Sequence, residues 1–348
     1  MKRLNYTLFI LFVLFFTSCK TAMVFTTLDI LRPAQVEFPP EVENLLIINN
    51  SKIQPEDVGH SIQFFSGQTR NFSVPTDSVS LFVLSVLAEE IEQIGFFASV
   101  DLLLNSANPN ADFNSITPLP RATVNRLLNT YDADAILSLD HIIARSEIEE
   151  NYFSGLGYFY TILNVRFDSF WSIHYPNNVP TVALHFQDSL FWQSESHNRA
   201  QALEGLPDTQ DALIDGALFV GYNSTRRFLP FWEQSDRFFF DSNNKLMRHA
   251  MDSVVVRNWE SAAELWKQAF NSTNNTRLRG EAANNIAIAY EILGDYDEAL
   301  KFAQISFDIF NARMGANDAV IRLSDYMLEL LRRKQELLLL DRQLGINP

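Results

Sequence analysis

Residues 159–175 read FYTILNVRFDSFWSIHY and give the clearest structural signal in the front part of the chain. Most of its odd-numbered positions are apolar, whereas its even-numbered positions are mostly polar. Residues 182–192, VALHFQDSLFW, repeat the alternation with the apolar residues at even positions. An alternation with a period of two indicates a strand with one buried face. The two stretches flank the turn sequence PNNVP at 176–180, so they predict an antiparallel hairpin.

Parity fixes part of the register of this hairpin. The apolar faces coincide only if the numbers of paired residues add up to an odd value, because a slip by one residue turns every side chain over. A turn centred near residues 178–179 would place Ile173 opposite Leu184 and Ser172 opposite His185. The polar face then carries the candidate binding residues of the front domain: Arg166, Asp168, His174, His185 and Gln187. An ordinary solvated sheet face would have the same composition.

The residues around the hairpin predict further strands and helices. Short apolar runs predict strands over 45–49, 97–104 and 135–139. Apolar residues at helical spacing predict helices over 78–97, 123–131 and 211–227. Residues 20–43 contain three prolines and read as an extended tether. This order of elements predicts an α+β fold, with a mixed α/β domain at the front of the chain.

The amino-acid composition changes after residue 240. Only four of the 29 phenylalanines lie there, and alanine, leucine, glutamate and arginine, which favour helices, become frequent. The sequence DSNN at Asp241–Asn244 offers loop and N-cap chemistry at this point. We therefore expect a signal peptide at 1–18, a lipid-anchored tether at 19–43, an α/β domain at 44–240 and a helical domain at 241–348.

Small, aromatic and glycine residues recur in the helical domain at fixed spacing. The sequence NIAIAYEILGDYDEAL at 285–300 supplies one set, and a second set precedes it: Ala287, Tyr290, Gly294, Tyr296 and Ala299, then Ala250, Trp259, Ala262 and Ala269. The spacing resembles that of a tetratricopeptide repeat, in which small residues let paired helices approach closely. One long helix over 314–344 would cap the array. An all-α array of helical hairpins is therefore expected behind the α/β domain.

The first 19 residues have the layout of a secretory signal. Lys2 and Arg3 precede the apolar run LFILFVLFF at 8–16, and the small residues Thr17 and Ser18 precede Cys19. The run is about half of the ~20 residues that span a bilayer as a helix. This order resembles the lipobox of bacterial lipoproteins, whose cysteine receives a diacylglyceryl group and becomes the new N-terminus. The resemblance implies cleavage before Cys19, lipidation of its sulfur and anchorage to a membrane.

Two further resemblances concern whole regions of the chain. The run YDADAILSLD at 131–140 resembles the strand entry of the N-terminal domain of TolB and of CsgG-like lipoproteins. The complete layout resembles an uncharacterised family of Bacteroidetes lipoproteins, a domain of unknown function with C-terminal repeats. The residues KTAMVFTT after Cys19 lack the acidic run of a surface-export signal. We therefore expect an envelope protein on the periplasmic face of the outer membrane.

Composition excludes several classes of function. Cys19 is the only cysteine, so a mature lipidated chain has no disulfide, thiolate metal site or cysteine nucleophile. The 27 basic and 42 acidic residues give a formal net charge of −15, which argues against nucleic-acid binding. The six histidines show no metal-ligand spacing, and the motifs of phosphate-binding and hydrolase loops are missing, so we expect no metal and no cofactor. Asp140 and His141 at a strand end could form an acid–base pair, but nothing pairs with them in the sequence, which favours an ordinary strand-end turn.

Two functions of different class remain. The first is a membrane-anchored scaffold that holds a protein partner on the surface of the helical array or on the terminal helix, without catalysis. The alternative is an envelope hydrolase that acts on glycan or peptide through carboxylates of the front domain. The repeat pattern favours the binding module, and no catalytic residue is assigned.

Overall fold

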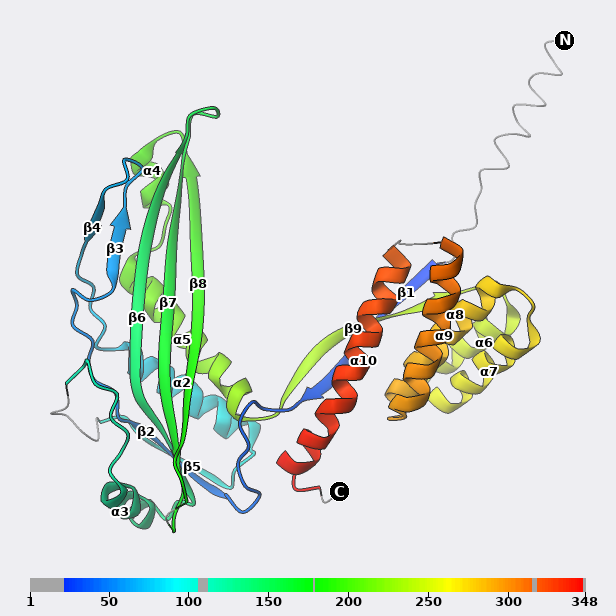
Figure 1. The fold of residues 1–348 in the computed structure, drawn as a ribbon, viewed down its shortest axis with the longest axis horizontal. Helices are drawn as coiled ribbons and strands as arrows, with labels where there is room; N and C mark the ends of the chain where they lie inside the picture. Colours follow the sequence, from blue (N-terminus) through cyan, green and yellow to red (C-terminus); the bar gives the residue numbers. More distant parts are fainter. Residues whose placement is uncertain (1–21, 106–111, 178, 315–317, 347–348) are drawn as a thin grey trace. The chain divides into compact units, whose positions relative to one another are not determined.

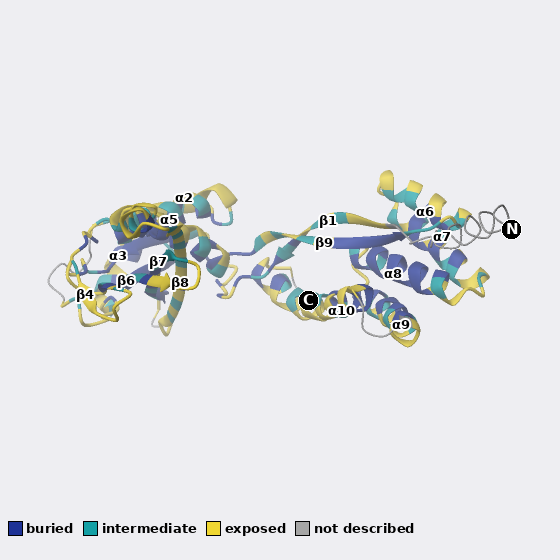
Figure 2. Cartoon of the chain, turned by 90° about the horizontal axis from the view of Figure 1, so that it is seen from above, coloured by how far each residue is buried: buried dark blue, intermediate teal, exposed yellow. Residues whose placement is uncertain are grey.

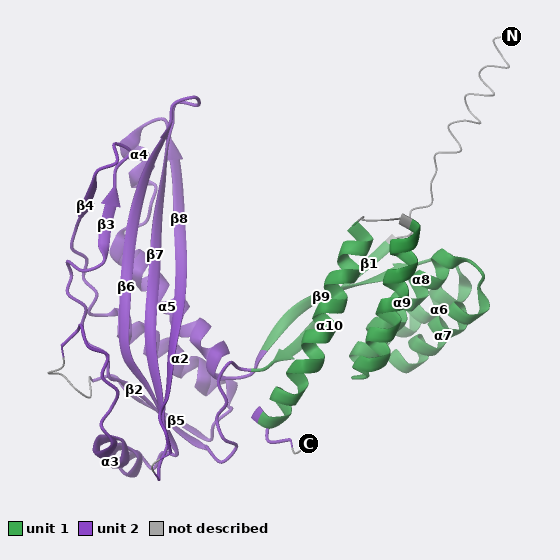
Figure 3. Ribbon diagram, in the orientation of Figure 1, with its two compact units in different colours: residues 1–33, 232–342, 347–348 green, residues 34–231, 343–346 purple. Residues whose placement is uncertain are grey.

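The computed structural model describes residues 22–105, 112–177, 179–314 and 318–346. These residues form two compact units (Figure 3). Unit 1 comprises the described residues up to Pro33 together with 232–342, and unit 2 comprises 34–231 and 343–346. The expected boundary at Asp241–Asn244 lies inside unit 1. The signal peptide and Cys19 lie outside the described residues.

Unit 2 is built on a seven-stranded sheet of the described residues (Figure 1). Its strands are β2 (Asn44–Asn49), β3 (His60–Gln63), β4 (Thr69–Asn71), β5 (Ser99–Leu103), β6 (Ala135–Phe153), β7 (Tyr158–His174) and β8 (Val182–Ser196). Strand β2 lies between β5 and the first half of β6, and all three are parallel. Strands β6, β7 and β8 form an antiparallel meander. The second half of β6 also pairs with β3, which carries β4.

Helices cover both faces of this sheet. Helices α2 (Val79–Ile94) and α5 (Thr209–Phe228) bury one face, and α3 (Arg121–Tyr131) covers the other. The connection from β2 to β5 and the connection from β5 to β6 cross the sheet in opposite directions. Right-handed crossovers then place their helices on opposite faces. The expected mixed α/β fold and the strands and helices predicted for it are confirmed, and the short α4 (Arg199–Glu204) was not predicted.

A glycine lets α5 lie close against α2. A Cβ atom on Gly221 would stand 2.6 Å from the carbonyl oxygen of Val83 and 2.9 Å from Cβ of Val86. A glycine inside a helix lowers its stability by about 0.5–1 kcal/mol relative to alanine. The close contact between the two backbones explains why glycine stands here nevertheless.

The hairpin has the predicted parity and a different register. Its paired residue numbers add up to an odd value, as Ile173–Val182 and Phe170–His185 show. The pairing of Ile173 with Leu184 and of Ser172 with His185 is wrong by two residues. Both registers bury the same faces, so the alternation of apolar residues cannot distinguish them.

Strand β6 is longer than the predicted strand over 135–139, because a bulge lets it continue. Leu139 pairs with Trp171 and His141 with Phe170, so Asp140 is an extra residue in β6. The inward-facing side chains are at odd positions up to Leu139 and at even positions from Ile142 onward. A bulge of this kind shifts the side-chain alternation by one residue.

Unit 1 combines a two-stranded ribbon with a run of helices. Its elements are β1 (Ala22–Arg32), β9 (Phe231–Asp241), α6 (Lys245–Val255), α7 (Trp259–Ser272), α8 (Thr276–Ile292), α9 (Tyr296–Met314) and α10 (Asp318–Gln343). Strand β1 pairs with β9, so the first part of the expected tether is a strand of this unit. Each of α6, α7 and α8 packs against the next helix, which confirms the expected C-terminal run of helices. No described helix is long and apolar enough to cross a membrane.

Candidate functional site

The polar face of the hairpin brings together three of the five residues predicted for it. Asp168 accepts a hydrogen bond of 2.7 Å from Nε2 of Gln187 and lies 3.0 Å from Nε2 of His185. Arg145 on β6, which the sequence did not single out, donates to the same carboxylate. Arg166 lies exposed beside this group.

This group on the hairpin is a cross-strand network. Burial by itself raises the pKa of Asp168, but the hydrogen bonds from Gln187, Arg145 and His185 outweigh it and lower that pKa below its usual value. The imidazole ring of His185 stacks on Phe170 with 4.3 Å between the ring centroids, so Phe170 covers one face of the imidazole. An anionic carboxylate that already accepts from three side chains has little capacity left for a ligand.

The fifth predicted residue, His174, lies buried at the other end of β7. Its Nδ1 atom is 3.0 Å from Oγ1 of Thr181, and the side chain is 1% exposed. Asp140 and His141 do not act as a pair either. The carboxylate of Asp140 accepts from Asn50 at 2.9 Å and Ser138 at 2.7 Å, while His141 lies between two phenylalanine rings.

The carboxyl end of β2 is the place where open α/β sheets commonly bind ligands. Here it is filled by the protein's own side chains. Asn49 Oδ1 accepts from the hydroxyl and the backbone N–H of Ser51, and Asn49 Nδ2 donates to Ser80. The hollow beside them, next to Lys52 and Asp77, has a volume of only about 10 Å³. Such a space holds at most one water molecule.

Three buried histidines make the stability of unit 2 dependent on pH. Burial lowers the pKa of His60, His141 and His174. In the unfolded chain these groups take up protons near pH ~6.5, whereas the folded protein binds them only at lower pH. Stability is therefore present above about pH 6.5 and falls as pH decreases through that value, by up to ~1.4 kcal/mol per pH unit for each histidine.

We expect His141→Phe to reduce this pH dependence by about one proton. The side chain lies 4.7 Å from the ring centroid of Phe113 and 5.9 Å from that of Phe170, so an apolar ring fits the surroundings. Denaturant unfolding of the full chain between about pH 7.5 and 5.5 measures the slope. His249→Phe, at an exposed position of α6, is the control and should leave the slope unchanged. An equal slope in the wild type and in His141→Phe would refute the prediction.

In unit 1 the residues of the repeat pattern occupy the packed centre of the helices. The five alanines are fully buried between neighbouring helices: Ala250, Ala262, Ala269, Ala287 and Ala299. Tyr296 is also buried, while Trp259 and Tyr290 are partly exposed. Gly294 has φ +83° in the turn between α8 and α9, a conformation that favours glycine. The pattern therefore marks packing positions.

Two asparagine side chains of helix α8 bind the backbone of strand β9. Asn284 Nδ2 donates to the carbonyl oxygen of Phe238 at 2.8 Å. Asn285 accepts from the N–H of Phe240 at 2.8 Å and donates to its carbonyl oxygen at 2.9 Å. Both asparagines are completely buried. These hydrogen bonds go to main-chain atoms of the strand. A receptor that binds an extended peptide uses hydrogen bonds of the same kind.

The side chains of β9 point alternately into two apolar clusters. Phe239 stacks on Trp266 with 5.5 Å between ring centroids and belongs to the core of α6–α9. Phe238 and Phe240 enter a second cluster, where Phe240 stacks on Phe310 at 5.2 Å. Figure 2 shows most of α8 and the C-terminal part of β9 in the colour of buried residues, and residues 237–240 of the strand are buried. The helices of unit 1 thus enclose the C-terminal part of an extended strand of their own chain.

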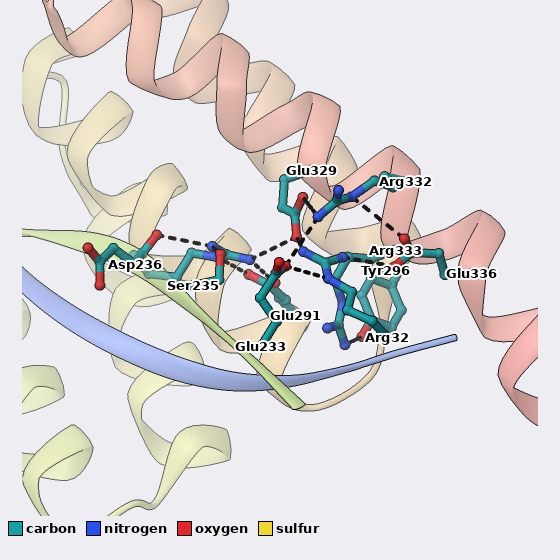
Figure 4. Close-up of polar contacts among 11 residues, drawn as sticks. Arg32, Glu233, Ser235, Asp236, Glu291, Tyr296, Glu329, Arg332, Arg333 and Glu336 are labelled. Atoms are coloured by element: carbon teal, nitrogen blue, oxygen red, sulfur yellow. Dashed lines mark hydrogen bonds and ion pairs between the residues drawn. The ribbon is translucent and has the colours of Figure 1, made fainter. Parts of the chain in front are cut away.

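A buried ion cluster lies beside this strand (Figure 4). Arg237 on β9 and Glu291 on α8 form an ion pair of 2.6 Å, and their side chains are 4% and 3% exposed. Burial by itself lowers the pKa of Arg237, but the hydrogen bonds and charge of Glu291 raise it above its usual value. Arg32 on β1 similarly contacts three carboxylates, those of Glu233, Glu329 and Glu336. The carboxylates of this cluster are therefore neutralised by arginine.

A pocket of about 270 Å³ opens next to the cluster. Aromatic rings and charges of both signs line it, mainly from Phe25, Phe238, Arg322, Asp325, Tyr326 and Glu329. The guanidinium of Arg322 lies 5.5 Å from the ring centroid of Phe25. Burial raises the pKa of Tyr326 well above its usual value, so its phenol stays protonated. A hollow of this size, with aromatic walls and charged groups, suits one or two side chains of a peptide.

The described residues contain no group of three histidine, cysteine or acidic side chains that could hold a metal ion. Fold and pocket together define a two-unit protein with an α/β sheet and a helical array that encloses a strand. Residues 42–240 match the family described as Domain of unknown function (DUF8603), and the chain belongs to this family. Residues 248–332 match a second one, Domain of unknown function (DUF6340). A comparison with curated proteins found no match.

Proposed function

We propose that this chain is a lipid-anchored, non-catalytic protein-binding module of the bacterial cell envelope. Its helical unit is then a tetratricopeptide-like array, and its anchor is the lipidated Cys19. The observation that supports the proposal most strongly is the capture of β9 by Asn284 and Asn285. The array already binds an extended polypeptide backbone, which is the task of a peptide-binding module.

The proposed site for the partner is the pocket between β1, β9, α8 and α10. Its rim carries Arg322 and Asp325, and the exposed ring of Phe25 forms one wall. This combination of an aromatic and an arginine is enriched at protein interfaces. A segment of a partner protein with one apolar anchor and a neighbouring charge would fit it.

The position of β1 in the chain limits how far from the membrane the proposed partner would bind. A chain of six residues spans at most roughly 20 Å, so a lipidated Cys19 keeps Phe25 within that distance of the lipid headgroups. The proposed location is the periplasmic face of the outer membrane, because residues 20–27 lack the acidic run of a surface-export signal. The partner would accordingly be another envelope protein.

The hydrolase alternative has less support. Hydrolysis by paired carboxylates requires two acids on either side of a bond to be cleaved. In unit 2, Asp168 and Asp140 are occupied by hydrogen bonds from their neighbours. The carboxylates near Arg32 and Arg237 form ion pairs. Glu329 shares the pocket of unit 1 with Asp325, but its carboxylate is paired with Arg32.

In-cell photocrosslinking tests the proposal. A photoreactive phenylalanine analogue at position 322 should form a covalent adduct with a specific envelope protein. The same residue at position 255, where Val255 is 82% exposed on α6 of the same unit, should not. Cys19→Ala should abolish the adduct if anchorage brings the two proteins together. Identical adduct patterns at both positions, or none at position 322 of the anchored protein, would contradict the proposal.

A further inference from the structure

Helix α10 has two apolar faces, and only one of them is buried in unit 1. The inner face packs against the other helices and β9, through Leu323, Tyr326 and Leu330. The outer face exposes four large apolar side chains: Ile321 at 55%, Leu328 at 64%, Leu331 at 46% and Leu338 at 68%. A helix of 26 residues is ~39 Å long, so this face is an extended stripe.

The outer face follows the seven-residue repeat of a coiled coil. Its positions alternate in steps of three and four: Ile321, Ser324, Leu328, Leu331, Gln335, Leu338 and Arg342. Residues at this spacing form one seam along a helix and pack into the matching seam of another helix. A single surface helix that packs only against its own unit needs one apolar stripe, so the second stripe calls for a partner.

We propose that α10 pairs with α10 of a second copy of this chain, in antiparallel orientation, as a two-stranded coiled coil. In one register every apolar residue of the seam meets another apolar residue. Ile321 then packs against Leu338 of the partner subunit, and Leu328 packs against Leu331 of the partner subunit. Ser324 faces Gln335 of the partner subunit. A shift by one heptad repeat in either direction places Ser324 or Gln335 against a leucine.

The charges beside the seam determine the orientation. In the antiparallel register Asp325 faces Arg332 of the partner subunit, and the twofold symmetry forms this contact twice. Arg332 forms an ion pair of 3.0 Å with Glu329 of its own helix, and its side chain is still 53% exposed, so a carboxylate of a second copy can reach it. In a parallel pair Asp325 would instead face Val320 of the partner subunit, and no ion pair would form. Opposite charges at flanking positions set the orientation of coiled coils.

A lipid surface is a poorer occupant of this stripe. The seam itself contains the polar residues Ser324 and Gln335, which a second copy would place opposite each other but which lipid tails would leave without hydrogen-bond partners. The self-complementary seam is explained by a second copy. This inference does not depend on the proposed function.

Disulfide trapping tests the pairing. In the full chain carrying Cys19→Ser, the double variant Ser324→Cys with Gln335→Cys should form a covalent dimer under mild oxidation. Ser324→Cys alone should stay uncrosslinked, because two copies of residue 324 would lie about 16 Å apart along the axis. Crosslinking by Ser324→Cys alone would show a parallel pair and overturn the antiparallel register. A double variant that remains monomeric would overturn the pairing altogether.

Sedimentation of variants without added cysteines provides the second measurement. Leu328→Glu should raise the dimer dissociation constant by about two orders of magnitude, because it buries carboxylates in two apolar layers. Val255→Glu, which also removes an exposed apolar side chain of unit 1, should not change it. A Cys19→Ser chain that is monomeric and co-sediments with phosphatidylglycerol vesicles would assign the stripe to lipid and refute the pairing.

Discussion

Replacing Arg237 with methionine should lower the free energy of unfolding of unit 1 by about 3–5 kcal/mol. The variant leaves the carboxylate of Glu291 without its ion-pair partner at a site where it is 3% exposed. Removing one member of a buried ion pair is strongly destabilising, because the remaining charge stays desolvated. Denaturant unfolding of the full chain, followed by the signal of unit 1, measures the loss.

The second half of this test removes both charges. Arg237→Met combined with Glu291→Leu should recover most of the loss, since an apolar pair of similar volume replaces the buried ions. Lys301→Met is the matched control, because Lys301 pairs with Glu298 on the surface and is 58% exposed. It should change stability by less than about 1 kcal/mol. A loss below that value for Arg237→Met would show that the cluster is open to water.

Trp266→Ala should destabilise unit 1 by about 3–5 kcal/mol. The indole is 0% exposed and stacks on Phe239 of β9 with an interplanar angle of 19°. Its removal leaves a cavity between α7 and the strand. Trp232→Ala is the control, because Trp232 is 66% exposed and its loss opens no cavity.

The Trp266→Ala variant also tests whether β9 is part of the core of unit 1. If the strand is part of the core of unit 1, the cavity weakens both α7 and β9, and their protection from hydrogen exchange falls together. A variant that unfolds like the wild type within about 0.5 kcal/mol would show that Phe239 does not fill the helical core.

The sequence predicted those elements whose pattern is local. The alternation over 159–175 and 182–192 gave the meander, and the helical spacing over 211–227 gave α5. The switch of the apolar positions from Leu139 to Ile142 is also visible in the sequence, and it marks the bulge at Asp140. The exact pairing of the hairpin was not predictable, because registers two residues apart bury the same side chains.

Strands β1 and β9 were not predicted, for a different reason. They pair with each other although about 200 residues separate them in the chain, and the prolines of 33–40 suggested an unpaired tether. A local signal for the docked strand exists in the pair Asn284–Asn285. Two consecutive amides in the alanine-rich middle of a helix require partners when they are buried. Here these partners are the main-chain atoms of β9.

The ion cluster could not be predicted from spacing. Arg32, Glu233, Glu291 and Glu329 come from four different elements, and each is unremarkable in its own segment. The candidate face of the hairpin was predictable as a polar surface. That Asp168 would be occupied by Arg145 depends on the register between β6 and β7, which the sequence left open.

Enclosure of β9 limits where a partner can bind. The surface of the helices that contacts Phe238, Phe239 and Phe240 is already filled. The proposed partner would therefore use the pocket beside the strand, or compete with the strand for Asn284 and Asn285. The pocket offers a free volume of about 270 Å³ without such competition.

Hydrogen exchange of β9 measures whether the helices of unit 1 hold this strand. The N–H of Phe240 donates to Asn285, so a peptide that covers 238–240 should exchange as slowly as α8 in the wild-type chain. In Asn285→Ala the same peptide should exchange much faster, while the sheet of unit 2 keeps its protection. Rapid exchange of 238–240 in the wild-type protein would contradict the account, because the strand would then not be held by the helices.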